Sequence, residues 1–115
     1  MGAREMAKIA IAAMEEKKAE DIRVIDIEEV SSIADFFIIA NGNNPSQVHA
    51  IADFVEEKLG RAGVNPKQVE GYRNANWVLM DYGDVIIHIF DRENRLFYDL
   101  ERIWKDGKKI DKEAL

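Results

Sequence analysis

The sequence contains no cysteine, so disulfide bonds, thiol nucleophiles and thiolate metal sites are excluded. It also lacks any apolar run of the roughly 18–20 residues that a membrane-spanning helix needs. The first residues do not have the charged and then apolar layout of a secretory signal, and their acidic character argues against a transit peptide. From these absences we expect a cytoplasmic protein that does not cross a membrane.

Basic residues are fewer than acidic ones, 16 against 22, which gives a formal net charge of -6 at pH 7. Nucleic-acid binding draws on clustered lysine and arginine, so we expect no specific readout of nucleic acid. Basic residues are scattered here, apart from a short tail with Lys105, Lys108, Lys109 and Lys112. An acidic protein is better matched to a basic protein surface, and ribosomal proteins are one abundant class of such surfaces. Charge alone does not choose among these partners.

What the sequence does contain is enough apolar material for one folded domain. Its 115 residues are 47% apolar, which suits a single domain with a real core and is too little chain for two. It has no internal repeat and no long linker. We therefore expect one domain over residues 1–115, with a polar C-terminal tail from about residue 106.

The first part of the chain predicts a helix followed by two strands. Residues 4–20 carry the apolar stripe of an amphipathic helix, and residues 22–27 have the pattern of a strand. Residues 36–40 form an uninterrupted apolar run between turn residues. Such a run is typical of a central strand that is covered on both faces.

A turn cluster at residues 41–46 separates this strand from a second helix. Asn44 suits the N-cap of that helix, with Pro45 at its first position and Gln47 three residues after the cap. The helix is expected to end near Gly60 or Gly63. The turn could instead hold a phosphate on its backbone amides, but it has one glycine and no lysine, so capping is favoured.

The second half of the chain predicts three strands and a last helix. A short strand ends at residues 70–71, two apolar strands within residues 77–90 are joined by a tight acidic turn, and a helix is expected around residues 100–104. A strand-helix-strand succession implies at least one parallel pair, and the tight turn implies an antiparallel one. The fold class is therefore α/β (α+β), with a mixed five-stranded sheet flanked by helices.

One group of carboxylates could support catalysis. Asp26 and Glu28 lie two residues apart in a predicted strand, so both could hold a divalent metal with a third carboxylate from Asp35 or Asp81. This would suit a metal-dependent nucleotidyl-transfer or nucleotide-hydrolysing enzyme. No phosphate-binding motif accompanies these residues, so a solvated acidic edge is favoured, and we expect no enzyme, no metal and no cofactor.

The two histidines, His49 and His88, could meet in space with Asp84 or Asp91 orienting one of them. No Ser-His or His-x-x-x-His pattern supports such a site. We interpret His88 as a half-buried structural imidazole and His49 as a surface residue.

Three large side chains near the acidic turn are candidates for a binding surface. Because side chains alternate along a strand, Met80 and Tyr82 share one face with Val78, while Trp77 lies on the other. Tryptophan and tyrosine are enriched at protein interfaces. The spacing alone fits a two-sided core strand equally well, and the choice stays open at this point.

Several sequence segments, taken together and in this order, closely resemble the ribosomal silencing factor family (RsfS, also called Iojap). The resemblance covers about residues 4–106. The segments are DFFIIANG at 35–42, QVHAIA at 47–52, EG at 70–71, WVLMDYGDVIIHIF at 77–90 and RLFYDLERIW at 95–104. The sequence departs from the family after Gly42, where a Thr-Ser-x-Arg-Gln pattern is usual and residues 43–47 read NNPSQ. The role of that loop is left open.

The resemblance implies a small α/β domain with a nucleotidyltransferase-like topology but without that activity. It also implies binding to the large ribosomal subunit through its L-fourteen protein, on the face that the small subunit would occupy. Occlusion of that face blocks subunit joining and represses translation under nutrient limitation. Members of the family are often homodimers when free.

These implications lead to the hypothesis of a non-enzymatic steric inhibitor of subunit association. Its partner-binding residues would be three apolar anchors and two carboxylates that pair with lysine or arginine on the ribosomal protein. The anchors are Trp77, Met80 and Tyr82, and the carboxylates are Asp81 and Asp84.

Overall fold

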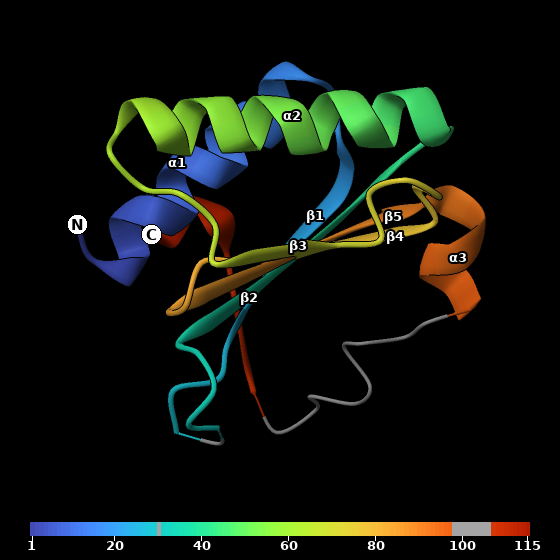
Figure 1. Ribbon diagram of the computed structural model, residues 1–115. Helices are drawn as coiled ribbons and strands as arrows, with labels where there is room; N and C mark the ends of the chain where they lie inside the picture. The colour runs from blue at the N-terminus through green and yellow to red at the C-terminus, as the bar shows by residue number, and fades with distance from the viewer. Residues whose placement is uncertain (30, 98–106) are drawn as a thin grey trace.

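The computed structural model describes residues 1–29, 31–97 and 107–115, which form a mixed sheet with helices packed on it (Figure 1). Within these residues the sheet has six strands in the order β3-β4-β5-β2-β1-β6. The α/β (α+β) class and the mixed sheet are confirmed, with six strands instead of five. The elements along the chain are α1 (Ala3–Glu16), β1 (Glu20–Asp26), β2 (Phe36–Gly42), α2 (Pro45–Arg61), β3 (Gln68–Glu70), β4 (Trp77–Asp81), β5 (Val85–Asp91), α3 (Arg92–Phe97), β6 (Lys108–Ile110) and the 3-10 turn η1 (Lys112–Ala114).

Helices α1 and α2 lie together over one face of the sheet, which we call the helix face (Figure 1). Each helix turns an apolar stripe inward, as its 3.6-residue period predicts. The stripes bury Met6, Ala10 and Met14 on α1, and Val48, Ile51, Ala52, Val55 and Leu59 on α2. They pack on the apolar side chains that β1, β2, β4 and β5 turn towards them, and these contacts form the main core.

The two central strands, β2 and β5, are parallel, and every other strand pair is antiparallel. Helix α2 carries the chain from β2 to the edge strand β3, and β4 and β5 then return step by step to the centre. Both expectations, a parallel pair and an antiparallel pair across the tight turn, are confirmed. All seven residues of β2 are buried, in agreement with a strand covered on both faces.

The sixth strand, β6, is a finding that the sequence did not predict. Residues 108–110 were expected in a polar tail, but they pair with β1 along one edge of the sheet. The strand has only three residues, two of which are lysines with exposed side chains. A short, charged edge strand protects a sheet from pairing with other chains, and it carries no apolar alternation to reveal it.

Two helices also differ from the sequence-based expectation. α1 ends at Glu16, four residues early, where Lys18 adopts a positive φ of 61° before β1 begins. α3 starts directly after β5, where the Asp91 carboxylate accepts a hydrogen bond from the backbone amide of Asn94 at 2.7 Å. The helix expected around residues 100–104 lies outside the described residues.

The start of α2 confirms the predicted cap. The side chain of Asn44 accepts a hydrogen bond from the backbone amide of Gln47 at 2.9 Å. In return, the side-chain oxygen of Gln47 accepts from the amide of Asn43, and its amide nitrogen donates to the carbonyls of Lys17 and Lys18. Gln47, which agrees with the family pattern, therefore joins the start of α2 to the end of α1, and the departing residues Asn43 and Asn44 pair with it.

The connection from β3 to β4 folds back tightly on the first residue of β4. Gly71 has a φ of +76°, and a Cβ added to it would lie 2.0 Å from the carbonyl oxygen of Trp77. The amide of Ala75 donates to the carbonyl of Gly71, and the amide of Asp91 donates to the carbonyl of Asn76. Gly71 thus allows a backbone contact that sets the position of Trp77, and no other residue type fits there.

Substitution of Gly71 by alanine should destabilise the fold strongly. Gly63 is a matched control, because it also has a positive φ, +87°, but nothing lies within 4 Å of its added Cβ. Gly63→Ala should cost about 1–2 kcal/mol of unfolding free energy, from the left-handed backbone alone. Gly71→Ala should cost about 1–3 kcal/mol more because of the added clash. Urea unfolding measures both values, and equal losses would show that the close approach to Trp77 is not a constraint.

Candidate protein-binding face of the sheet

The alternation of side chains along β4 divides the predicted binding residues between two faces. Val78 and Met80 point to the helix face together with Tyr82 of the following turn, whereas Trp77, Leu79 and Asp81 point the other way. We call this second side the far face. Its apolar side chains come from four neighbouring strands, and they are Ile25, Phe37, Ile39, Trp77, Leu79, Ile86 and Phe90.

Two of the predicted anchors are core residues. Met80 is 1% exposed and Tyr82 is 5% exposed, and both belong to the main core under the helices. Burial raises the pKa of Tyr82, and no described residue hydrogen-bonds its hydroxyl group. Side chains at such positions cannot reach a partner unless the fold opens. The structure therefore corrects the expectation that Met80 and Tyr82 are surface anchors.

Trp77 remains a candidate anchor because it is only half-buried, on the far face. Its ring stacks on Phe90, directly opposite on β5, with a centroid distance of 5.2 Å and an interplanar angle of 26°. Its indole nitrogen donates a hydrogen bond of 3.0 Å to Nδ1 of His88. Leu79, which the sequence analysis did not select, lies beside it and is also half-buried. The strand period could have identified Leu79 once the outward face of β4 was known.

His88 is more deeply buried than predicted, with only 3% of its surface exposed. Burial lowers its pKa to about 4, so the imidazole is neutral at pH 7. Because an indole N–H can only donate, Nδ1 of His88 is the acceptor and its proton sits on Nε2. Among the described residues, nothing hydrogen-bonds this Nε2–H group. The far face therefore contains a buried imidazole that contacts Trp77 and has one unpaired N–H group among the described residues.

The two predicted carboxylates lie at the tight turn that ends β4. Gly83 adopts a φ of +84°, and the amide of Tyr82 donates to the carbonyl of Val85, as in a two-residue hairpin turn. Asp81 is half-buried and accepts a hydrogen bond from the amide of Gly83 at 2.8 Å, so it stabilises the turn. Asp84 is exposed. The turn thus has one carboxylate that stabilises it, Asp81, and one that faces solvent, Asp84.

The carboxylates of the alternative enzymatic interpretation do not form a metal site in this structure. β1 ends at Asp26, whose side chain accepts a hydrogen bond from the amide of Glu28 in the following turn. Glu28 therefore lies beyond the strand and does not share a face with Asp26. In residues 1–29, 31–97 and 107–115, no three histidine, aspartate or glutamate side chains gather closely enough to hold a metal ion.

The two histidines lie on opposite sides of the sheet. His49, on α2, is half-buried and stacks on Tyr72 with a centroid distance of 4.4 Å, while His88 lies on the far face. The structure therefore does not bring them together as a catalytic pair. It also gives each histidine an aromatic neighbour that the sequence pattern did not identify.

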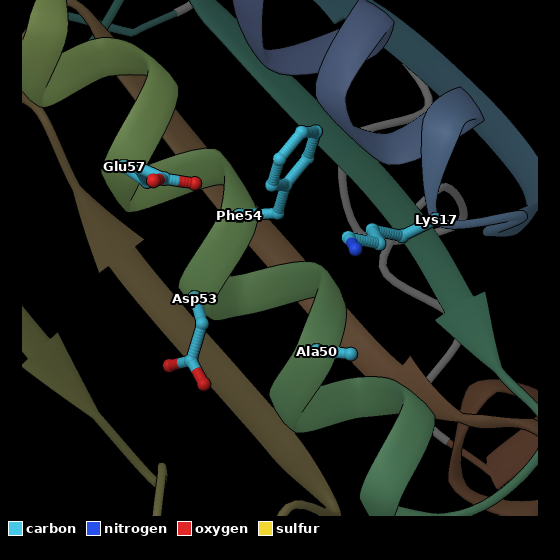
Figure 2. Close-up of a pocket in the computed structure, with 5 residues that line it drawn as sticks. All are labelled: Lys17, Ala50, Asp53, Phe54 and Glu57. Atoms are coloured by element: carbon cyan, nitrogen blue, oxygen red, sulfur yellow. The ribbon is translucent and has the colours of Figure 1, made fainter.

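A shallow depression of about 320 Å³ lies between the end of α1 and the outer side of α2 (Figure 2). Phe54 projects towards α1, and the ammonium groups of Lys17 and Lys58 lie 4.7 and 5.1 Å from the centre of its ring. Asp53, on the rim, accepts a hydrogen bond from the hydroxyl of Tyr72. These pairings already engage the polar groups, so the depression offers no assembled catalytic group.

No described helix is long and apolar enough to cross a membrane.

The buried histidine makes stability depend on pH. With a folded pKa of about 4 and an ordinary value of 6.5, the unfolded state binds more protons between these pH values. The contribution of His88 is therefore complete above pH 6.5 and is lost as the pH falls towards 4. Over this interval the wild type should lose about 2–3 kcal/mol more unfolding free energy than His88→Leu. Urea unfolding at several pH values measures the difference, and parallel losses would contradict burial of a neutral imidazole.

Comparison with known proteins identifies the family. All of residues 1–115 match the family described as "Ribosomal silencing factor during starvation". The chain is 41% identical over 111 residues to ribosomal silencing factor RsfS of Bacillus subtilis, covering 96% of this chain and 94% of that protein. It is 38% identical over 115 residues to RsfS of Halalkalibacterium halodurans, covering 100% and 98%. A crystal structure of a Chromobacterium violaceum protein has a TM-score of 0.89 and 38% identity, with 96% and 92% covered. The resemblance seen in the sequence is confirmed, and this chain belongs to the ribosomal silencing factor family.

Proposed function

We propose that this chain represses translation by binding the large ribosomal subunit through its L-fourteen protein, so that the small subunit cannot join. The names of its relatives support a regulatory role on the ribosome. Repression would follow from occupation of the joining face under nutrient limitation, and it needs no catalytic step. We place this activity in the cytoplasm, with a homodimer as the free form.

The main support for the proposal is the outward pair Trp77 and Leu79 on the far face of β4, with the exposed carboxylate of Asp84 in the turn that follows this strand. Half-buried aromatic and aliphatic side chains beside charged groups are the usual arrangement of a protein contact, with an apolar centre and a polar rim. In this proposal Trp77 and Leu79 replace Met80 and Tyr82 as the anchors. Asp81 supports the turn, and Asp84 faces the partner.

The charge distribution fits a basic partner such as a ribosomal protein. The net charge of -6 favours approach to a positive surface, and Asp84 adds a local acidic group at the edge of the contact. Exposed ion pairs mainly guide encounter and are screened by salt, whereas buried apolar anchors supply most of the affinity. The two kinds of residue should therefore have separable effects on binding.

Trp77→Ala should weaken binding to purified large subunits by about 2 kcal/mol or more, as expected for a central aromatic anchor. Co-sedimentation with large subunits over a range of subunit concentrations measures this loss. Phe54→Ala is the matched control, because Phe54 is also a half-buried aromatic residue but lies on α2, on the other side of the sheet. Circular dichroism confirms that both variants keep the fold.

The same two variants test the proposed inhibition. Wild type and Phe54→Ala, added to large subunits first, should reduce the light scattering that reports joining of small subunits. Trp77→Ala should reduce it less at equal concentration. Equal inhibition by all three proteins would reject Trp77 as an anchor, and no inhibition by the wild type would reject the proposed function.

Asp84→Asn should lower the salt dependence of binding and weaken it by up to about 1 kcal/mol at low salt. Glu16→Gln, on α1, removes the same charge from an exposed position at the helix side and serves as the control. Affinity for large subunits is measured at several potassium chloride concentrations. Identical slopes for the two variants would mean that net charge, and not the position of Asp84, governs the encounter.

A further inference from the structure

His88 occupies a position where an apolar residue would be the simpler choice. It lies within β5, among Ile86, Ile87, Ile89 and Phe90, and is itself almost fully buried. Its Nε2–H group has no hydrogen-bond partner among the described residues. A buried donor without a partner costs stability, because it has given up water and gained nothing in return. Packing alone therefore does not explain a histidine at this position.

The gain from His88 is the hydrogen bond that it accepts. β4 and β5 pair so that Leu79 lies opposite His88 and Trp77 lies opposite Phe90. Trp77 is thus the diagonal neighbour of His88, within reach of its ring, and the indole nitrogen donates to Nδ1 at 3.0 Å. Stacking on Phe90 fixes the plane of the indole, and the hydrogen bond fixes which edge of the indole points inward.

A third strand holds the imidazole itself. Phe37 of β2 meets the ring of His88 edge to face, with a centroid distance of 4.9 Å and an interplanar angle of 63°. This contact limits rotation of the imidazole, so that Nδ1 stays directed at Trp77. His88 thus contacts Phe37 of the central strand β2 on one side and the half-buried Trp77 of β4 on the other.

We propose that His88 is a positioning residue, which holds the Trp77 indole in the orientation used for partner binding at some expense of fold stability. This inference rests on the proposed function, because it assigns Trp77 the role of an anchor. It assigns to His88 a role in recognition that acts entirely through Trp77. A purely structural histidine would instead contribute to stability and affect binding only when the fold is weakened.

Two substitutions separate these roles. His88→Leu keeps an apolar side chain of similar size but removes both the acceptor and the unpartnered donor. It should be at least as stable as the wild type at pH 7 but bind large subunits about 3- to 10-fold more weakly, the equivalent of one hydrogen bond. His88→Asn keeps an acceptor at the place of Nδ1 but is smaller, so it should be less stable than His88→Leu and yet bind more tightly. Binding and stability would then rank the two variants in opposite orders.

The orientation of the indole can also be read in the free protein. The Nε1–H proton of Trp77, assigned in the NMR spectrum with Trp77→Phe, should lie downfield and exchange slowly in the wild type. In His88→Leu it should move upfield and exchange faster, and in His88→Asn it should stay close to the wild-type position. The resonance reports whether His88 holds the indole, and the affinities report whether partner binding uses that orientation.

The outcomes distinguish the two proposals. Affinities that follow the order of stability, or an indole resonance that is unchanged in His88→Leu, would overturn the positioning role even if the wild type binds large subunits. Failure of the wild type to bind large subunits would overturn the proposed function, while the resonance would still decide whether His88 orients Trp77.

Discussion

The strict two-residue alternation of β4 and β5 determines which of their side chains enter the core and which face outward. Both strands lie inside the sheet, so every second side chain packs under α1 and α2 and the others point to the far face. Register fixes this division, and a slip by one residue would exchange Met80 with Leu79. The tight contact between Gly71 and Trp77 and the turn at Gly83 set the register at the two ends of β4.

The same alternation gives the far face its chemistry. It places Trp77 above Phe90 and next to His88, and it leaves Leu79 half-buried beside them. In the proposed function these residues and Asp84 make up a contact surface with an apolar centre and an acidic edge, which would suit a basic protein. In this proposal, stability comes mainly from the helix face and recognition comes from the far face. His88 lowers the stability of the fold but orients Trp77 for recognition.

The sequence predicts much of this fold because its signals are local. The cap at Asn44, the buried run of β2 and the alternation of β4 are each visible within a few residues, and all are confirmed. The outward face of β4 depends instead on where α1 and α2 pack, which is a tertiary choice that spacing cannot reveal. For this reason spacing predicts anchors at Met80 and Tyr82, which the structure places in the core, and a polar tail where the structure has the short edge strand β6.

A cryo-electron-microscopy map of the chain bound to large ribosomal subunits would show which face of the sheet contacts the ribosome. We expect the far face at β4, with Trp77 and Leu79, to lie in the interface with the L-fourteen protein, and α1 and α2 to face away from it. A complex in which α1 and α2 form the interface, with Trp77 directed to solvent, would contradict the assignment of partner binding to the far face.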